Sequence, residues 1–550
     1  MEKSHIKMKV TTISCMEKKL PEDKNLIVES SSVTLKNMKH CFILAVESDS
    51  QDCVFNVDVV PRGELASCIK INAIDYVGAP FTLTGFSDDY YLGRSGVYPD
   101  VIREKKAGGY MISPHSNTYF WVSVQSEDGL PIGDKTIYLD VVDANGKLIE
   151  TATYNLSVLD AVKEKANFVK TMWMHYDCIC HKHGVQPFSE QFYSIFEKYL
   201  KAYTEIGHNA LLVPIFTPPL DTYIGGERLT AQLIKGTKTD DGYEFDFAEL
   251  EKFLDFILAR GIEYIEFSHL FTQWGGTSCP KIMATTSEGE KRIFGWESDS
   301  CSVEYEQFLD ALLPQIVKIV KDKGIEQKCR FHITDEPNEN HIERYRKCRE
   351  LVKRNVGNIP TMDAVSHYEY YAEGLVDIPV PSVKSVKEFT DKGVENLYAY
   401  YCCNPSDKYY SNRLLCMPTQ RTRVIGLQLY ETDVKGFLHW GYNFYNSGLS
   451  YYPIDPYADS TAGGAFPPGD GYIVYPEKDG VNISIRSEAM RMAYDDYDLL
   501  YTLEKKIGKE KVKKMLHDAG VIGYTKYPHS ALWHEQFINE VKLEIAKNNN

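Results

Sequence analysis

The sequence lacks the features of an exported, membrane-spanning or nucleic-acid-binding protein. The first residues, from Met1 to Lys9, contain no apolar segment and no small-residue cleavage site, so we expect no signal peptide and a cytoplasmic protein. No apolar run approaches the roughly 20 residues that span a bilayer. The 77 acidic residues outnumber the 61 Lys and Arg, giving a formal net charge of -16. Because nucleic acids and anionic membranes bind basic surfaces, we expect neither as a partner.

Cofactor motifs are also absent. No glycine-rich phosphate loop follows the first strand of the α/β region, and the 13 cysteines show no zinc-ribbon spacing. The pairs Cys178-Ile-Cys180 and Cys402-Cys403 lie in apolar, strand-like surroundings, where free cysteine behaves as a small hydrophobic residue. We therefore expect free thiols and no cofactor.

Two histidine clusters could ligate a metal. His181-Lys-His183 could join Asp177, but this spacing matches no familiar zinc motif. His332 could join the acids at 335 and 336, but its position within a strand favours a satisfied core histidine. We therefore expect no metal site.

The length of 550 residues predicts two or three domains. Residues 26–159 show period-two patterns such as Tyr119-Phe-Trp-Val-Ser-Val, and Asp143-Ala-Asn-Gly146 is a hairpin signal. We expect an antiparallel β-sandwich over residues 1–165.

The pattern then changes to helix, glycine and strand. Ser189 is expected to cap a helix that ends at Gly207 before an apolar strand, and the same order recurs before Gly261 and Gly324. Eight candidate strands follow at 171–176, 210–216, 262–267, 329–334, 360–364, 376–380, 397–401 and 436–440. Strands that alternate with helices predict a parallel sheet, and eight of them favour a closed (β/α)8 barrel over residues 166–505. A doubly wound open sheet is the competing interpretation, disfavoured by the missing phosphate loop.

The last segment, 506–550, is expected to be helical. Trp533, Phe537, Val541 and Ile545 repeat at intervals of four residues, as on one face of a helix. This segment should pack on the barrel or on the sandwich.

Polar and aromatic residues follow the predicted strands, which in a barrel places them around one open mouth. Carboxylates, amides and aromatic rings together favour sugar binding. The residues are Asp177, His181, His183, Thr217, Asp221, His269, Trp274, Asp335, Glu336, Asp363, His367, Tyr368, Tyr401, Asn404, Trp440, Tyr442 and Asn443.

The run Cys329-Arg-Phe-His-Ile-Thr-Asp335-Glu336-Pro337 carries the strongest signal for chemistry. An apolar strand delivers two adjacent carboxylates at its tip, and carboxylates are costly to bury. A purely structural interpretation makes Asp335 the N-cap of the following helix. The position at a strand tip favours a catalytic role for Asp335 and Glu336.

Four motifs in order resemble glycoside hydrolase family 123 and the wider domain-of-unknown-function 4091 group. They are Asp335-Glu336-Pro337, Gly436-Phe-Leu-His-Trp-Gly-Tyr-Asn443, Gly469-Asp-Gly-Tyr-Ile-Val-Tyr-Pro476, and Ser484-Ile-Arg-Ser-Glu-Ala-Met-Arg with Asp496-Tyr-Asp-Leu-Leu500. The resemblance covers roughly residues 165–505. It implies an N-terminal β-sandwich, a barrel, no metal, and a retaining β-N-acetylgalactosaminidase whose adjacent acids are Asp335 and Glu336.

Adjacent carboxylates start from one side of a sugar and cannot act as separated acid and nucleophile. Substrate assistance avoids this difficulty, because the 2-acetamido oxygen attacks the anomeric carbon and forms an oxazolinium intermediate. We assign Glu336 as general acid and then base, and Asp335 as the group that polarises the acetamido group. We expect the pKa of Glu336 to rise, since two neighbouring carboxylates do not ionise freely.

The remaining predicted site residues follow from strand-tip placement. Trp440 is expected to lie under the sugar, and Tyr401 or Tyr442 to bind the acetamido oxygen. His269 and Asn443 are expected to bind hydroxyl groups. Asp177 completes the predicted binding residues.

Two other functions stay open. One is a glycosidase for sugars without the acetamido group, with Asp177, Asp363 or Glu431 as nucleophile. The other is a non-catalytic carbohydrate-binding protein. The expected partner is a small glycan or glycoside, and no pattern indicates an oligomeric state.

Overall fold

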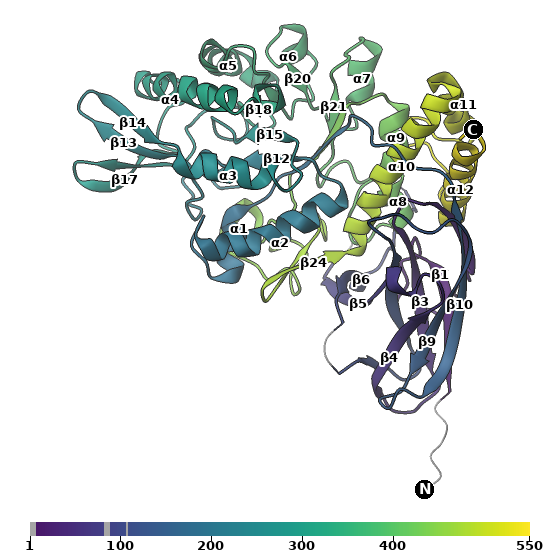
Figure 1. Cartoon of the computed structure of the whole chain (residues 1–550). Helices are drawn as coiled ribbons and strands as arrows, with labels where there is room; N and C mark the ends of the chain where they lie inside the picture. Colours follow the sequence, from purple (N-terminus) through teal and green to yellow (C-terminus); the bar gives the residue numbers. More distant parts are fainter. Residues whose placement is uncertain (1–6, 82–87, 106–107, 550) are drawn as a thin grey trace. The chain divides into compact units, whose positions relative to one another are not determined.

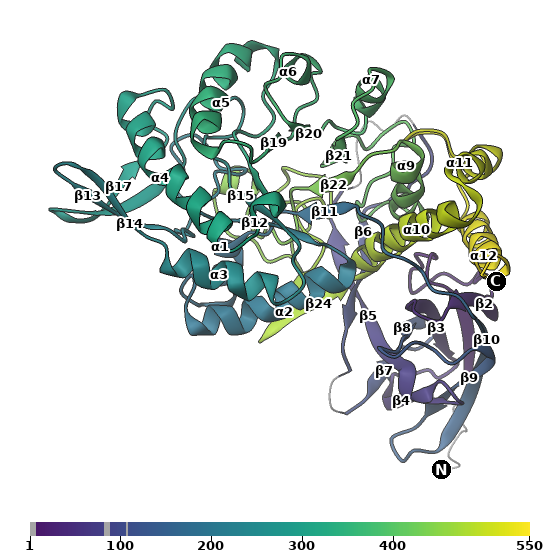
Figure 2. The same cartoon turned by 45° about the horizontal axis from the view of Figure 1, so that its top comes forward.

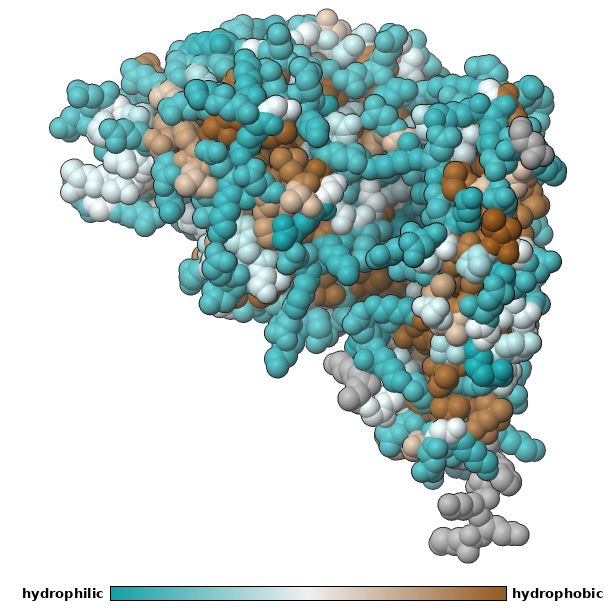
Figure 3. Space-filling view, in the orientation of Figure 1, coloured by the Kyte–Doolittle hydropathy of each residue, from teal (hydrophilic) through white to brown (hydrophobic). Residues whose placement is uncertain are grey.

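The computed structural model describes residues 7–81, 88–105 and 108–549. The chain forms two compact units. The first comprises Met1–Ala166, Ser406–Glu431 and Asn482–Asn550, and the second comprises Asn167–Pro405 and Thr432–Val481. The three domains expected from the sequence, 1–165, 166–505 and 506–550, stay a prediction. The surface in Figure 3 is mostly hydrophilic, as a charged fraction of 25% leads one to expect. No helix among the described residues is both long and apolar enough to cross a bilayer.

Two β-sheets pack face to face in the first unit. Strands of the first sheet pair antiparallel in the order β1 (Met8–Ser14), β3 (His40–Ser48), β8 (Asn117–Val124), β5 (Ile69–Ala79) and β6 (Gly96–Arg103), and Ile483 and Ser484 of β24 (Gly480–Ser484) pair with β6. The second sheet has the order β2 (Ser31–Leu35), β10 (Leu148–Leu159), β9 (Gly133–Val142), β4 (Val54–Arg62) and β7 (Tyr110–Ile112). Only the β2–β10 pair among these described strands is parallel, which departs from the antiparallel prediction.

Strand β3 is buried on both faces, which explains its continuous apolar sequence. Phe42 and its alternate neighbours face the second sheet, where Phe42 stacks on Tyr154 with ring centroids 4.0 Å apart. Ile43 and its alternate neighbours lie against Trp121 and against Ile485 of the long helix α10 (Ile485–Ile507). A strand with one solvated face would alternate apolar with polar residues.

The helices of the first unit are α8 (Thr419–Arg423), α9 (Ile425–Glu431), α10, α11 (Lys509–Asp518) and α12 (Ala531–Lys547). Ser484 caps α10 in a capping box with Ser487. Helices α9 and α10 approach closely at Gly426, where a Cβ atom would lie 1.9 Å from the carbonyl oxygen of Ala493. The ammonium group of Lys542 in α12 donates to the carbonyl of Val33 in β2, so this helix packs on the sandwich side.

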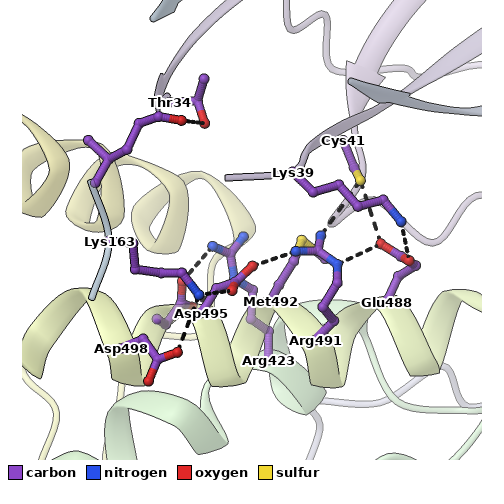
Figure 4. A network of polar contacts seen from close by, with 12 residues as sticks. Thr34, Lys39, Cys41, Lys163, Arg423, Glu488, Arg491, Met492, Asp495 and Asp498 are labelled. Carbon is purple, nitrogen blue, oxygen red and sulfur yellow. Dashed lines mark hydrogen bonds and ion pairs between the residues drawn. The ribbon is translucent and has the colours of Figure 1, made fainter. Parts of the chain in front are cut away.

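Buried and half-buried ion pairs join α10 to residues that flank the sandwich strands β3 and β10 (Figure 4). Glu488 binds Lys39 at 2.6 Å and Arg491 at 3.0 Å. Asp495 binds Lys163 at 2.6 Å. Each of these charges therefore has a partner of opposite sign.

Six parallel strands form the central sheet of the second unit. Their order is β18 (Cys329–Phe331), β15 (Tyr264–Phe267), β12 (Ala210–Val213), β11 (Val169–Met172), β22 (Gly436–His439) and β21 (Tyr398–Tyr400). Strands β19 (Met362–Asp363) and β20 (Ile378–Pro379) form a separate parallel pair. Single parallel bridges, Phe331 with Thr361 and Ser382 with Tyr400, connect the two groups. The fold is thus mixed α/β, and no continuous closed ladder of eight strands forms within the described residues.

Helices lie around these strands (Figures 1 and 2). They are α1 (Tyr176–His183), α2 (Glu190–Ile206), α3 (Ala248–Leu258), α4 (Val303–Asp322), α5 (Ile342–Val356), α6 (Glu369–Ala372) and α7 (Val386–Asp391). Ser189 caps α2 and Gly207 ends it in a left-handed conformation, as predicted.

A four-stranded sheet at the left edge of Figure 1 was not predicted. Its order is β14 (Gly242–Asp246), β13 (Lys235–Thr239), β16 (Ile282–Thr286) and β17 (Gly289–Phe294). Both hairpins are inserted between the parallel strands and the helices that follow them.

Candidate active site

An open pocket of about 680 Å³, including space open to solvent, lies at the carboxyl ends of the parallel strands. Trp173 follows β11, Trp440 follows β22, and Tyr400 ends β21. The lining consists of Trp173, Leu220, Asp221, Gln273, Trp274, Asp335, Glu336, Ala364, Tyr400, Cys402, Cys403, Leu438, Trp440, Phe466 and Asp470. The pocket therefore has aromatic walls and four carboxyl groups, with no Lys or Arg among the described lining residues.

Asp335 and Glu336 lie in a bend between β18 and the next helical turn. Strand β18 ends at Phe331, earlier than predicted, and Asn338 caps the 3-10 helix Glu339–His341. The N-cap interpretation of Asp335 is therefore wrong. Glu336 has a backbone φ of +44°, which is rare for a residue with a side chain. The Tyr400 hydroxyl donates to Glu336 Oε1 at 2.5 Å.

The pKa of Asp335 lies well above its usual range. Burial is the main cause, and the neighbouring Glu336 carboxylate adds to the rise, while the charge of His332 opposes it. The rise expected for the pKa of Glu336 stays a prediction, and the burial of Asp335 raises the pKa of that carboxyl. One proton is thus held by the adjacent pair well above the pH at which an ordinary aspartate releases it.

A charged histidine lies beneath this pair. His332 is fully buried, with Nδ1 3.3 Å from Asp363 Oδ1 and Nε2 3.3 Å from Glu266 Oε2. Burial lowers its pKa, but hydrogen bonds and charge from the two carboxylates outweigh this and raise the pKa to about 9. His332 is therefore a core imidazolium with both ring nitrogens occupied, as its strand position indicated.

The pocket and its acidic pair agree with the family that the sequence matches. A model of the family "Glycoside hydrolase 123, catalytic domain" matches residues 173–503, more than half of the chain. The chain belongs to glycoside hydrolase family 123. Membership makes it a glycosidase and confirms the resemblance drawn from the four motifs.

A solved family 123 structure supports the fold. The family 123 glycoside hydrolase from Clostridium perfringens, studied for glycolipid glycan hydrolysis, has a TM-score of 0.74 at 16% identity, covering 98% of this chain and 97% of that one. A β-galactosidase from Bacillus circulans sp. alkalophilus has a TM-score of 0.36 at 9% identity, covering 60% and 56%. An endo-β-1,4-mannanase from Thermotoga petrophila has 0.35 at 12%, covering 61% and 77%. The last two scores are too low to support an argument. No curated protein sequence matches the chain.

In this family 123 chain, Asp335, Glu336 and Trp440 line the pocket as predicted. Trp440 Nε1 donates to Asp470 Oδ2 at 3.1 Å, and its ring meets Phe466 edge-on with centroids 5.3 Å apart. The indole is thus held by a hydrogen bond and by a second aromatic ring at the pocket.

Five other predicted residues do not line the pocket. Tyr442 and Asn443 are fully buried, where the Tyr442 hydroxyl donates to Tyr199 O and the Asn443 amide binds both backbone groups of His175. Asp177 forms a buried ion pair with Arg228, whose charge, against the effect of burial, keeps the pKa of Asp177 below its usual range. These three are corrected from substrate-binding to structural positions.

Tyr401 and His269 are the other two corrections. Tyr401 packs edge-on against Phe437, because residues of a strand alternate sides and its neighbour Tyr400 faces the pocket. His269 stacks on His332 with centroids 4.5 Å apart and is 1% exposed. Burial and the His332 charge hold its pKa well below the usual range.

Neither histidine group that the sequence analysis weighed and rejected as a metal site appears as a ligand cluster among the described residues. Asp177 is occupied by Arg228, and His183 binds the Tyr199 hydroxyl at 3.1 Å. A different group, His269, His332 and Asp363, brings candidate ligand atoms within 4.8 Å of one another. Asp363 already accepts hydrogen bonds from Ile333 N at 2.9 Å and from the Tyr345 hydroxyl at 2.5 Å. This donor set suits a hydrogen-bonded imidazolium better than a metal ion.

Other residues at the pocket were missed or not chosen. Asp470 lies within the motif Gly469–Pro476, and Tyr400 directly precedes the predicted Tyr401. Both residues could therefore have been found from the sequence. Asp221 and Trp274 stood among the strand-tip residues. Burial raises the pKa of Asp221 to about 6, against a hydrogen bond from Leu449 N. Gln273 and Phe466 lie in irregular segments without a pattern to indicate them.

Proposed function

We propose that the chain is a retaining, exo-acting β-N-acetylgalactosaminidase that uses substrate assistance. The observation that carries this proposal is the adjacency of Asp335 and Glu336 in one pocket wall. Side chains of neighbouring residues approach a sugar from one side, so they do not supply a nucleophile opposite the acid. The substrate's acetamido oxygen supplies the nucleophile instead.

In this mechanism, binding of the sugar changes the protonation of the two acids. In the empty pocket a proton resides on Asp335, whose pKa is raised by burial. An acetamido N–H that donates to Asp335 favours the carboxylate form there, and Glu336 acts as the general acid. Glu336 protonates the leaving oxygen and afterwards deprotonates the water that opens the oxazolinium ring.

Other pocket residues take roles that differ from the first assignment. The Tyr400 hydroxyl donates to Glu336 at 2.5 Å. In the complex with the sugar, this hydroxyl donates to the acetamido oxygen instead. Trp440 provides an apolar surface for the sugar ring, and Asp470, which is fully buried, holds the indole by accepting from its Nε1.

We also propose that the parallel strands form a (β/α)8 barrel. The order of the six-stranded sheet and the pair β19–β20 supports it, as do the bridges from Phe331 to Thr361 and from Ser382 to Tyr400. The cytoplasmic location stays a proposal as well.

The alternative with a separate nucleophile is less well supported. Asp177 is paired with Arg228, Asp363 is fully buried under His332, and Glu431 binds His517 and Gly523 N. None of the three lines the pocket.

The test is a panel of aryl β-glycosides with and without the 2-acetamido group. We expect hydrolysis with retention only of the acetamido substrates, and inhibition by an N-acetyl thiazoline. Equal turnover of both classes, with trapping by a 2-deoxy-2-fluoro glycoside, would establish the separate nucleophile. Sugar binding without any hydrolysis would establish a binding protein.

A further inference from the structure

A cysteine lies at the surface of the second unit, directly before the helix α4. Cys301 is exposed and precedes Ser302, the residue that caps α4. Arg344 Nη1 donates to Cys301 Sγ at 3.5 Å. Arg344 belongs to α5, which packs beside α4 (Figures 1 and 2). A guanidinium group beside a thiol favours the thiolate, which is the reactive form of cysteine.

A second thiol lies behind the first one, in the interior. Cys348 of α5 is 2% exposed, and its Sγ lies 4.0 Å from Gly276 O. Ser300 Oγ donates to the same carbonyl at 2.6 Å and lies 3.9 Å from Cys301 Sγ. Neither cysteine is in a disulfide. An exposed thiol and a buried thiol are thus placed around one serine hydroxyl and one backbone carbonyl.

The two thiols differ in acidity. Hydrogen bonding to Cys348 is the main reason that the pKa of Cys301 is lowered, to about 6. Ser300 and the charge of Arg344 also lower this pKa, whereas burial and the charge of Asp299 oppose the fall. The same hydrogen bond, together with burial, raises the pKa of Cys348 well above its usual range. Cys301 therefore ionises first, and Cys348 keeps its proton.

Other cysteines of the chain lie in surroundings that favour the neutral thiol. Burial is the main cause that raises the pKa of Cys178 and of Cys329. In the pocket, Cys402 and Cys403 have Sγ atoms 3.9 Å apart. Hydrogen bonding to Cys403, burial and the carboxylates of the pocket raise the pKa of Cys402. Because protonated thiols react slowly with oxidants, oxidation should begin at Cys301.

We propose that Cys301 is a modification site that hydroperoxides oxidise, and that Cys348 converts the product into a disulfide between α5 and the segment before α4. An exposed thiolate beside a second cysteine is the arrangement found in proteins that respond to oxidants. The proposal concerns residues outside the pocket and does not depend on the proposed glycosidase mechanism.

The reaction needs only the two cysteines and one hydroperoxide molecule. The Cys301 thiolate attacks one oxygen of hydrogen peroxide, the O–O bond breaks, and hydroxide leaves, so that Cys301 becomes a sulfenic acid. The hydroxide takes up the proton that Cys301 had released. The Cys348 sulfur then attacks the Cys301 sulfur, and the sulfenic hydroxyl group leaves with the Cys348 proton as water. The two sulfur atoms lose two electrons, and the peroxide is reduced to two water molecules.

The first test treats the full-length protein with one equivalent of hydrogen peroxide and maps its thiols by peptide mass spectrometry. In the wild type we expect a peptide pair joined by Cys301 and Cys348, which dithiothreitol separates. Cys348→Ser should instead leave a sulfenic acid at Cys301 that dimedone captures, and Cys301→Ser should give neither product. Cys53→Ser removes a half-buried cysteine of the sandwich unit, is the matched control, and should behave as the wild type.

The second test measures alkylation by iodoacetamide. At pH 6.5, Cys301 should react about fivefold faster than Cys53, because its larger thiolate fraction outweighs the lower nucleophilicity of a more acidic thiol. The advantage should disappear at pH 9 and should shrink at pH 6.5 in Arg344→Gln, which replaces a half-exposed side chain.

Two results overturn the proposal. One is equal alkylation of Cys301 and Cys53 at pH 6.5, which removes the reactive thiolate. The other is peroxide treatment of the wild type that leaves Cys301 reduced, or oxidises it without a bond to Cys348. Because Cys348→Ser changes a buried position, circular dichroism checks its fold. The wild-type disulfide map decides the proposal even if that variant does not fold.

Discussion

The two units bury charge in opposite ways. Every carboxylate drawn along α10 in Figure 4 faces a cation. Burial alone would raise the pKa of Glu488, but the charges of Lys39 and Arg491 outweigh it and lower this pKa to about 2. In the pocket, Asp335 faces another carboxylate and its pKa rises. A buried acid with a cation stabilises the fold, whereas a buried acid beside another acid holds a proton for chemistry.

Removing the proposed proton donor, Glu336, should have the largest effect. We expect Glu336→Gln to lower kcat about a thousandfold for aryl glycosides with poor leaving groups, within the usual range for general acid–base catalysis. Substrates with good leaving groups should lose less in the first step. Initial rates across a leaving-group series measure this.

The matched control is Glu339→Gln, an exposed glutamate three residues away in the next helical turn. It should retain wild-type rates. Wild-type rates in Glu336→Gln itself would remove the acid assignment.

Asp335→Asn should reduce kcat by about a hundredfold or more while making the protein more stable. Because the folded-state pKa is raised, the folded protein binds this proton more tightly than the unfolded chain does. The contribution of Asp335 to stability therefore falls as pH rises from about 4 through the raised pKa, and the group is destabilising at neutral pH. Thermal unfolding at pH 7 should show a higher Tm for the variant, and a lower Tm would contradict this account of the pocket.

In the other unit, Glu488→Gln should lower the stability of the protein instead of raising it. The neutral amide leaves Lys39 and Arg491 buried with one fewer counter-charge, and breaking such a pair costs about 3 kcal/mol of unfolding free energy. The lowered pKa of Glu488 means that its contribution is present above the unfolded value near 4.3 and lost as pH falls towards 2. Urea unfolding at pH 7 and at pH 3 measures both effects. An equal loss of stability at the two pH values would contradict the ion-pair explanation.

The last effect is the pH dependence that His332 gives to the wild type. Its folded-state pKa of about 9 lies above the unfolded value near 6.5, so its stabilisation is complete below pH 6.5 and is lost as pH rises through 9. Tm measured from pH 6 to 10 should fall over this window. His367→Gln, an exposed histidine in the same unit, should show the same fall, and a flat profile in the wild type would show that His332 is neutral.

The place of Asp335 and Glu336 in the pocket could be predicted from the sequence, because a strand, two acids and a proline fix these residues at a strand end. The neighbouring aromatic residues show the limit of that reasoning. Tyr401 was chosen, but Tyr400 faces the pocket, since a shift of one residue in a strand reverses the side chain's direction. Strands of two to four residues, such as Met362–Asp363, carry too few residues to reveal their own alternation.

Loops were the least predictable part of the site. Gln273 and Phe466 lie in segments without period, and the positions of the loops depend on long-range hydrogen bonds such as that from Leu449 N to Asp221. The inserted hairpins between 235 and 294 were also missed, because their strands are only five or six residues long and mostly exposed, so they carry little apolar alternation.

The left-handed backbone of Glu336 has an evolutionary consequence. Glycine adopts φ near +44° without strain, whereas a glutamate held there costs the fold on the order of 1–3 kcal/mol. Selection for thermal tolerance alone would therefore replace this glutamate with glycine. If Glu336 is the proposed acid, selection for turnover retains it, and a lineage evolved without substrate should lose this glutamate before it loses the fold.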